Sequence, residues 1–446
     1  MKVSLHWLKR FVDFDLTATD LADKLTMRGF ESEVVTDFDS LDNLVVGDVL
    51  SAEKHPDADK LKLCSVSDGN ETFNVVCGAP NVDTGQKIVF AKVGAVLPGD
   101  FKIGKAKIRG VESFGMICSE RELGISEEHD GIMVLDDSLK AGTPIKDILG
   151  PLFNAIDIEV TPDKAFALSH RGIAREVATI VGSKLKTPIS TTELKTTSKD
   201  VVSVDLDKKG GCTRYIAGVM KGVKVGPSPD WLADYLKSVG QKSINNLVDI
   251  SNFMLLEIGH PTHIFDLNKL HKPAIEVSWA KKGEKFDALD EETYELSADH
   301  MVITDTKNTI ALAGIIGGMD SSVTDSTTEV LIESAYFDPV TIRKSSKSLN
   351  LSTEASKRYE RGADPNIASL AFWKILSLIE ENAGGSFNGE YLDLLPVDIE
   401  KRVVQVRFSE IEQILGIHLD QERITSILEG LGFLVSFSEE GLFNCT

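Results

Sequence analysis

The chain has 446 residues, of which 42% are hydrophobic and 26% are charged, and its formal net charge is -21. No apolar run approaches the roughly 18 residues of a membrane-spanning helix, and the first ten residues lack the apolar core of a secretory signal. Five cysteines are scattered without metal-ligand or disulfide spacing, so we expect a cytoplasmic protein with no membrane partner. The acidic excess disfavours non-specific binding of nucleic acid, because phosphates are repelled at long range.

Residues 1–38 predict a small α/β unit. Ser4 can cap a first short helix, and a second helix is expected at 19–27, where Gly29 supplies a C-terminal stop. Residues 31–35 then have the composition of a strand. Trp7 and Phe11 are expected in the core of this unit.

Residues 39–150 change character, because short apolar segments alternate with Gly, Pro and Asp turns. Strands are predicted at 44–52, 61–66, 73–76, 87–91 and 132–135. Short strands with closely spaced turns are typical of a small barrel or sandwich. His55, Asp57 and Asp59 have the side chains of metal ligands, but we interpret them as a solvated turn and expect no metal site.

Positive charge is concentrated in residues 86–110, in contrast to the acidic chain as a whole. Six basic residues stand here beside a single acid, Asp100. They are Lys87, Lys92, Lys102, Lys105, Lys107 and Arg109. This local segregation would allow a nucleic-acid ligand to bind despite the net charge.

Residues 151–195 predict a strand at 156–162 and a helix at 170–180 with Ile173, Val177 and Ile180 on one face. A linker is expected at 186–199, which is rich in Thr, Ser and Lys.

Residues 200–398 form the largest block and mix both kinds of element. Strands are expected at 200–205, 215–221, 300–305 and 330–337, and helices at 229–238, 245–257, 338–348 and 364–383. Residues 400–446 begin another unit, with a strand at 402–408 and helices at 409–415 and 420–430. Ser409 and Asp420 are the expected N-caps of these two helices.

The strand at 330–337 carries one acid on an otherwise apolar face. Side chains alternate along a strand, so Glu333 shares its face with three apolar residues: Leu331, Ala335 and Phe337. Burying a carboxylate is costly unless a partner compensates it. This acid therefore has either a structural partner or a ligand.

Two interpretations of this stretch stay open. Beside Gly317-Gly318, where the missing Cβ atoms let a ligand approach, Glu333 would belong to a pocket for a small polar ligand. Alternatively the glycines form a turn, and Glu333 is a structural acid paired with an arginine and has no cavity nearby. The arginines available for this pairing are Arg343, Arg358 and Arg361.

Several separate motifs, in the right order, resemble the β subunit of bacterial phenylalanyl-tRNA synthetases. They lie at residues 55–61, 77–81, 110–119, 260–266, 311–318, 330–337 and 351–362. The resemblance implies an α+β multidomain fold, in which a tRNA-binding OB-fold barrel at 39–150 is inserted into a small α/β N-terminal domain. That domain would comprise 1–38 and 151–195.

The resemblance also implies an editing module of the B3/B4 type at 200–398. The start of a helical, winged-helix-like domain of the B5 type would follow at 400–446. Because the chain stops inside that domain, we expect a fragment of a longer subunit.

The function implied by the resemblance is binding of tRNA(Phe) and hydrolysis of tyrosine wrongly attached to it. Aminoacylation with ATP would take place on an α subunit, in an α2β2 heterotetramer. Mg2+ and ATP are expected for that full enzyme, and no cofactor or metal is expected within this chain. No DNA partner is expected. The alternative is a tRNA-binding or structural module without hydrolytic activity.

An editing pocket must orient a water molecule, bind the substrate's amine and recognise the phenol hydroxyl that phenylalanine lacks. By resemblance, Glu333 would bind this hydroxyl, while His263 and Asn252 would hold the ester end and a water. Thr353 would complete the catalytic set. The substrate-binding set would comprise Gly317, Gly318, Ala355, Ser251 and Lys242. The six basic residues of the window at 86–110 would bind tRNA, mostly through charge, because aromatic residues are few there.

No nucleophile–base–orienter triad stands out, so we expect direct attack by water. His263 could equally be a structural histidine. The chain also departs from the family pattern. Lys164 stands where an arginine is usual and loses a planar bidentate fork. Lys242-Ser243 replaces Arg-Pro and Ser251 replaces Thr, which could alter the grip on the terminal adenosine.

Overall fold

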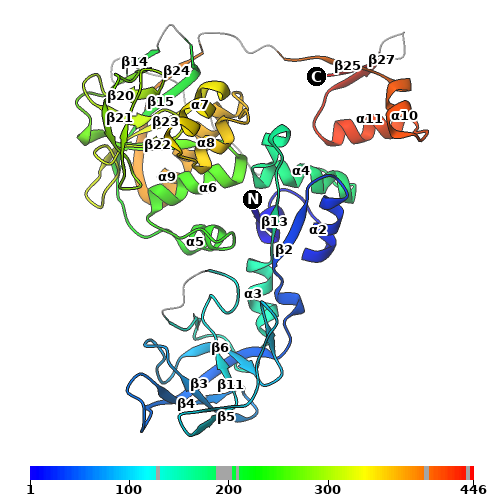
Figure 1. Ribbon diagram of the computed structural model, residues 1–446, viewed down its shortest axis with the longest axis vertical. Helices are drawn as coiled ribbons and strands as arrows, with labels where there is room; N and C mark the ends of the chain where they lie inside the picture. The colour runs from blue at the N-terminus through cyan, green and yellow to red at the C-terminus, as the bar shows by residue number, and fades with distance from the viewer. Residues whose placement is uncertain (127–130, 187–202, 207–209, 396–400, 438–441) are drawn as a thin grey trace. The chain divides into compact units, whose positions relative to one another are not determined.

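The structure is a computed structural model that describes all residues except 127–130, 187–202, 207–209, 396–400 and 438–441 (Figure 1). The chain divides into two compact units. The first comprises Met1–Lys9, Asp15–Glu159 and Asp234–Lys242, and the second comprises Arg10–Phe14, Val160–Ala233 and Ser243–Thr446. Residues 187–199 of the linker predicted at 186–199 lie outside the described residues. None of the described helices has the length and apolar character required to cross a bilayer.

The first unit contains a three-stranded antiparallel sheet of order β1-β13-β2. Its strands are β1 (Lys2–Ser4), β13 (Ala155–Ile158) and β2 (Ser32–Thr36), so segments on both sides of the barrel share one sheet. Helix α1 (Leu5–Leu8) begins at the predicted cap Ser4. Helix α2 (Ala18–Thr26) confirms the second predicted helix, with Thr17 as its N-cap. Trp7 is fully buried, as expected, whereas Phe11, also fully buried, falls in the segment Arg10–Phe14 of the second unit.

A nearly closed barrel makes up the rest of this unit. Its antiparallel sheet has the order β11-β6-β3-β4-β5, and β12 pairs with β6. The strands are β3 (Leu44–Lys54), β4 (Lys62–Ser67), β5 (Thr72–Cys77), β6 (Lys87–Lys92), β11 (Gly115–Ile117) and β12 (Val134–Leu135). The backbone N–H of Phe114 donates to the Asn74 carbonyl at 2.9 Å, and that of Val76 donates to Ser113 Oγ at 3.1 Å. The two edges of the sheet therefore meet, and the predicted barrel is confirmed.

A long loop joins β6 to β11 and carries most of the basic window. It contains four short strands: β7 (Val96–Leu97), β8 (Phe101–Lys102), β9 (Ala106–Ile108) and β10 (Val111–Ser113). In OB-type barrels this loop and the face of the second and third strands form the usual binding surface. Those strands are β4 and β5 here.

The second unit is built on two sheets. The first is antiparallel, of order β16-β23-β15-β24. Its strands are β16 (Thr262–Asp266), β23 (Glu329–Phe337), β15 (Cys212–Val223) and β24 (Gly384–Leu394). The second has the order β14-β17-β20-β21-β22. Its strands are β14 (Ser203–Leu206), β17 (Ala274–Trp279), β20 (Met301–Thr304), β21 (Thr309–Leu312) and β22 (Ile316–Gly317).

The two faces of the first sheet have different neighbours. On one face, Ser334 donates to the carbonyl of Ala368 in α9 (Ile367–Ala383) at 2.8 Å, and α6 (Asn246–Ile258) packs beside α9 (Figure 1). The opposite face, with Leu331, Ala335 and Phe337, packs in one apolar core with residues of the second sheet. Glu333 therefore points between the two sheets, as the alternation predicted.

Most predicted elements of this unit are present, with corrections at their ends. Helix α5 (Asp230–Lys237) and α7 (Pro339–Leu349) match the predictions, and α9 starts a turn later than expected. Strand β24 is not predicted by the sequence pattern, because the Gly384-Gly385 pair at its start is typical of a turn.

The C-terminal residues form a small three-stranded sheet with two helices. The strands β25 (Val404–Arg407), β27 (Leu442–Cys445) and β26 (Val435–Phe437) pair in this order. The helices are α10 (Phe408–Leu415) and α11 (Gln421–Gly430). Arg407, not Ser409, occupies the N-cap of α10, so the predicted cap was wrong. With both helices and strands in every part, the chain has the mixed α+β character that was expected.

Candidate functional site

A cavity of about 80 Å³ lies beside Glu333 in the second unit and is called the Glu333 pocket below. Its lining comes from β16, β20, β21, β22, β23, α8 (Glu354–Tyr359) and the loops beside them. The lining residues are Pro261, Thr262, His263, Ile303, Ala311, Leu312, Gly314, Ile315, Ile316, Gly317, Glu333, Ala355 and Tyr359. The wall is thus largely apolar, with Glu333, His263 and Tyr359 as its ionisable side chains.

Glu333 is 6% exposed and bonds to a tyrosine. The hydroxyl of Tyr215, a fully buried residue of β15, donates to Glu333 Oε2 at 2.5 Å. Burial raises the pKa of Glu333 to about 7, although the bond from Tyr215 acts in the opposite direction. The carboxyl group is therefore poised between its two protonation states near neutral pH.

The three arginines proposed as partners of Glu333 are engaged elsewhere or exposed. Arg358 donates to Glu354 and to the carbonyl of Leu168, and Arg361 donates to the carbonyl of Val160. Arg343 is exposed on α7. Among the described residues no arginine bonds Glu333, and a cavity adjoins it, so the interpretation as an arginine-paired structural acid was wrong.

His263 lies directly opposite Glu333 in the pairing of β16 with β23. Residues opposite one another in an antiparallel pair project from the same face. The ring is buried and packs edge-on against Phe265 at a centroid distance of 4.4 Å, and its Nε2 has no hydrogen-bond partner in the described part of the chain. Burial lowers the pKa of His263 to about 4, so the imidazole is neutral at pH 7. It offers an unused polar atom at the pocket.

Gly317 is required by the position of this ring. A Cβ atom at residue 317 would lie 2.4 Å from His263 Cε1 and 2.9 Å from Leu289 Cδ1. Gly318 has another role: its N–H donates to the Ile310 carbonyl at 2.8 Å, and it is not part of the pocket lining as described. Of the glycine pair, Gly317 therefore makes room for the His263 ring, and Gly318 makes a backbone contact.

Two of the predicted residues form hydrogen bonds with segments that line the pocket. Thr353 caps α8, accepts the N–H of Ser356 at 3.0 Å and donates to the Ile315 carbonyl at 2.8 Å. Ser251 in α6 donates to the Thr262 carbonyl at 2.7 Å. Each hydroxyl thus fixes a lining segment without being part of the described lining itself.

The remaining predicted residues are distributed differently. Ala355 lines the pocket directly. Asn252 is half-buried on α6 and is not among the described lining residues. Lys242 is exposed and falls in the first unit. The structure therefore brings together His263, Gly317, Glu333 and Ala355 from the predicted set.

Sequence reasoning missed Tyr215 and Tyr359. Tyr359 is buried on α8 and donates to the Ala335 carbonyl at 2.8 Å. The strand prediction at 215–221 already gave a signal for Tyr215, since a tyrosine on a buried strand face needs a partner for its hydroxyl.

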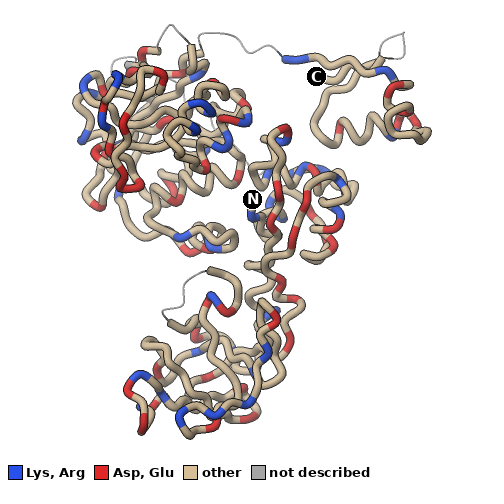
Figure 2. Tube along the Cα trace, in the orientation of Figure 1, with Lys and Arg blue, Asp and Glu red and all other residues tan. Residues whose placement is uncertain are grey.

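The six basic residues of the barrel divide into two groups. Three of them form ion pairs: Lys87 with Asp48, Lys92 with Asp68 at 2.5 Å, and Lys105 with Glu112 at 3.0 Å. Lys102, Lys107 and Arg109 are exposed and form no ion pair with the described residues. Figure 2 shows acidic and basic positions interspersed along the barrel. Within this window, the basic residues without an ion pair among the described residues thus lie in the loop between β6 and β11.

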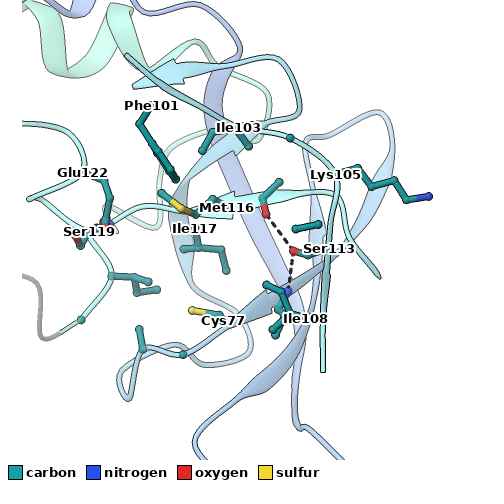
Figure 3. A pocket seen from close by; sticks show the side chains of 18 of the residues that line it. Cys77, Phe101, Ile103, Lys105, Ile108, Ser113, Met116, Ile117, Ser119 and Glu122 are labelled. Atoms are coloured by element: carbon teal, nitrogen blue, oxygen red, sulfur yellow. Dashed lines mark hydrogen bonds between the residues drawn. The ribbon is translucent and has the colours of Figure 1, made fainter. Parts of the chain in front are cut away.

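A cleft of about 580 Å³ lies under this loop (Figure 3). Phe101, Ile103, Met116 and Ile117 give it an apolar wall, and Lys105 extends away from them. At the turn between β3 and β4, His55 Nδ1 accepts the N–H of Asp57 at 3.0 Å, so the predicted turn is present. Asp57 and Asp59 are exposed as expected, but His55 is 2% exposed, so the prediction that it is solvated was wrong. Among the described residues no group of three or more His, Cys, Asp or Glu side chains is arranged to hold a metal.

Models of known protein families match both the region of the Glu333 pocket and the barrel. The model of the B3/4 domain matches residues 211–384, and the model of a putative tRNA binding domain matches residues 44–144. A solved N-terminal fragment of the phenylalanyl-tRNA synthetase beta-subunit from Pyrococcus horikoshii is 18% identical, with coverage of 66% of this chain and 80% of that one. Its TM-score of 0.30 is too low to support an argument about the fold.

Relatives found by sequence are much more similar. The Phenylalanine--tRNA ligase beta subunit of Syntrophotalea carbinolica is 43% identical over 445 residues, which are 99% of this chain and 55% of the relative. That of Geobacter sulfurreducens is 42% identical over 451 residues, covering 100% of this chain and 56% of the relative. The chain spans about half the length of these curated relatives. On this identity along its whole length, it belongs to the family of phenylalanine–tRNA ligase beta subunits.

Proposed function

We propose that the chain binds tRNA(Phe) and hydrolyses tyrosine wrongly attached to it. The observation that carries this proposal is the Glu333 pocket, where a buried carboxyl group and an unused imidazole nitrogen adjoin one small cavity. The match to the tRNA-binding domain model and the exposed basic loop support binding of tRNA.

The pocket has the chemistry to select tyrosine over phenylalanine. The phenol hydroxyl of tyrosine would donate to Glu333, whose Oε2 already accepts from Tyr215. A phenyl ring would leave that buried group without its second partner, which is the situation that gives strong discrimination between substrates. Gly317 would let the ring approach, and the volume of about 80 Å³ suits one ring better than a whole aminoacyl ester.

Hydrolysis would proceed by direct attack of water on the ester carbonyl. The new C–O bond forms as the bond to the ribose oxygen breaks, and the water's proton passes to that oxygen. His263 Nε2, neutral and unbonded, would hold the water or the ester end at the pocket mouth. Thr353 and Ser251 would keep the wall in place. Asn252 and Lys242 lie outside the lining, so they have no role in this scheme.

We further propose the domain limits expected above and a place for the chain in a larger enzyme. By its family, that enzyme would contain an α subunit that forms phenylalanyl-tRNA with ATP and Mg2+, in the α2β2 assembly and in the cytoplasm. None of these partners is needed for ester hydrolysis by the Glu333 pocket itself.

The test is release of labelled tyrosine from tyrosyl-tRNA(Phe) by the purified chain. Glu333→Ala and His263→Ala should slow release, whereas Arg343→Ala, on the exposed face of α7, should not. If the chain retards tRNA on a gel but never cleaves the ester, the alternative of a binding module without hydrolytic activity is favoured.

A further inference from the structure

A second cavity, of about 130 Å³, lies in the same unit and is called the His260 cavity below. It adjoins the start of α4 (His170–Val181), the end of α6 and the loop before α9. The polar residues on its wall are Ser169, Arg171, Arg175, His260 and Asp364. Its volume is several times the roughly 30 Å³ that one water molecule occupies in the liquid.

His260 is buried without a hydrogen bond. It is 1% exposed, and neither Nδ1 nor Nε2 has a partner in the described part of the chain. Burial, with Arg214 nearby, lowers the pKa of His260 to about 3, so the ring is neutral and carries one N–H at pH 7. Leaving such a group unsatisfied is costly. A molecule that accepts this N–H inside the cavity would remove the cost.

The cavity wall carries two positive side chains, Arg171 and Arg175, and one negative side chain, Asp364. Arg171 and Arg175 form no ion pair with the described residues, and the pKa of Arg175 is lowered by burial and then by Arg171. Glu176 and Asp364 offset part of this charge. Asp364 is nevertheless exposed. Its Oδ1 accepts hydrogen bonds from the backbone N–H of Asn366 at 2.9 Å and from the side-chain amide of Asn366 at 3.1 Å.

The start of α4 adds to the positive field. Its twelve residues are long enough for a helix dipole, and Ser169 caps it by accepting the N–H of Gly172 at 3.0 Å. Two guanidinium groups, a helix N-terminus and an unsatisfied imidazole N–H form a donor set that suits a tetrahedral oxyanion.

The His260 cavity and the Glu333 pocket are neighbours. His260 precedes Pro261, Thr262 and His263, all of which line the Glu333 pocket. Tyr359 also lines that pocket, and its ring lies edge-on to His260 at a centroid distance of 6.2 Å. One short segment therefore separates the two cavities.

We infer that the His260 cavity binds a backbone phosphate of the single-stranded 3′ end of tRNA, whose terminal ester enters the Glu333 pocket. The inference rests on the proposed function, since only an RNA 3′ end connects a phosphate with an aminoacyl ester. Arg171, Arg175 and His260 act as donors to the phosphate and fix the strand at the correct depth.

The experiment measures binding of a short, fluorescently labelled single-stranded RNA with the sequence of the tRNA 3′ end, without an amino acid. Arg171→Ala and Arg175→Lys are compared with Arg343→Ala, which removes one positive charge from an exposed helix face of the same unit. Loss of a charged hydrogen bond predicts weakening of about tenfold or more for Arg171→Ala. Arg175→Lys, which keeps the charge and loses the fork, should weaken binding less, and Arg343→Ala should stay within about twofold.

Inorganic phosphate serves as a second probe, through its effect on the melting temperature. It should raise the melting temperature of the wild type and of Arg343→Ala, but not that of Arg171→Ala. If both cavity variants bind RNA like Arg343→Ala, the inference is overturned. If phosphate stabilises the wild type while RNA affinity is unchanged in the variants, the cavity takes a free oxyanion and the assignment to RNA is wrong.

The outcome is separable from that of the proposed function. Because the RNA carries no ester, its binding does not require hydrolysis. Tyrosine release without sensitivity of RNA binding to Arg171 would overturn the phosphate site alone. Sensitivity of RNA binding to Arg171 without any tyrosine release would overturn the hydrolytic function alone. Circular dichroism of each variant excludes misfolding, and Arg171, a half-exposed residue, provides the variant least prone to it.

Discussion

Tyr215 holds one oxygen of Glu333 by a 2.5 Å hydrogen bond from the neighbouring strand of the same sheet. Both side chains are buried, and the two residues are 118 positions apart in sequence. The bond engages Oε2 and restrains the orientation of the carboxyl group beside the Glu333 pocket. In the proposed function, specificity of the Glu333 pocket would therefore depend on a residue that is not among its described lining.

Removal of this bond should alter the pH dependence of hydrolysis. The bond from Tyr215 lowers the pKa of Glu333, so Tyr215→Phe should raise that pKa further above 7. We expect tyrosine release to rise with pH as Glu333 ionises. In Tyr215→Phe this rise should occur at a higher pH than in the wild type. Tyr336→Phe, a change on the half-buried face of the same strand as Glu333, provides the control and should leave the profile in place. Superimposable pH profiles for all three proteins would show that Tyr215 does not act on Glu333.

Glu333 should also make the stability of the fold depend on pH. Its pKa is about 7 in the folded chain and 4.5 ordinarily, so the folded state binds the proton more tightly. The contribution of this group to the free energy of unfolding is greatest below pH 4.5 and falls by about 3 kcal/mol as pH rises through 7. Glu333→Gln keeps an acceptor for Tyr215 and abolishes this titration.

The measurement is urea unfolding of the wild type and Glu333→Gln at pH 5 and pH 8. The variant should gain stability relative to the wild type at pH 8. The buried His263 acts with the opposite sign, because its pKa is lowered and its stabilisation is lost as pH falls through about 4. It is present in both proteins, so the difference between them isolates Glu333. An identical pH response of the two proteins would contradict the prediction.

Gly317→Ala should damage both stability and the pocket. The new methyl group would lie 2.4 Å from His263 Cε1, so the ring or the strand must move. Overpacking of this kind costs about 1–3 kcal/mol, measurable as a lower urea midpoint. A methyl group at Gly226 would meet no heavy atom within 4 Å, so Gly226→Ala is the matched control. A Gly317→Ala protein as stable and as active as this control would show that His263 can move freely.

The barrel should bind tRNA through three unpaired basic residues. We expect Lys102, Lys107 and Arg109 to contact phosphates, whereas Lys87 and Lys92 are neutralised by Asp48 and Asp68. Replacing all three exposed residues by alanine should weaken tRNA binding at low salt. It should also reduce the slope of log affinity against log salt by up to about 2, at roughly 0.7 per lost contact on a single strand.

The control for the barrel variant is an alanine triple at exposed positions of α7: Arg343, Lys344 and Lys347. It removes the same charge from the other unit. Equal loss of affinity in both triples would mean that total charge, not the loop between β6 and β11, determines binding.

Local pattern predicted much of the fold. Alternation along 330–337 placed Glu333 on the core face, and the barrel strands followed from their turns and β-branched residues. Strand β24 escaped prediction because Gly384-Gly385 signals a turn, while pairing with β15 in the folded chain extends the backbone through it. The cap of α10 was wrong by two residues, since the backbone N–H and the guanidinium of Arg407 both donate to the Glu410 carboxylate at that helix start.

The candidate site was predicted less completely than the fold. His263 and Glu333, which face each other on paired strands, were grouped through the family resemblance, because no local pattern joins the two segments. The partner of Glu333 could not be predicted, because the contact with Tyr215 depends on strand pairing over a long separation. Thr353 illustrates a different limit. It was predicted to belong to the catalytic set, but its single hydroxyl group caps a helix.

The barrel is inserted in the sequence between two strands of the three-stranded sheet, and this has a consequence for how such proteins are assembled. The last residue of β2, Thr36, pairs with the first residue of β13, Ala155. The chain therefore leaves the three-stranded sheet for the barrel, and returns to it, at two directly paired positions. A tight hairpin turn could bridge the same gap. Excision or exchange of the barrel would thus require no rearrangement of the host, which makes this junction a natural site for acquiring, losing or grafting a whole RNA-binding domain.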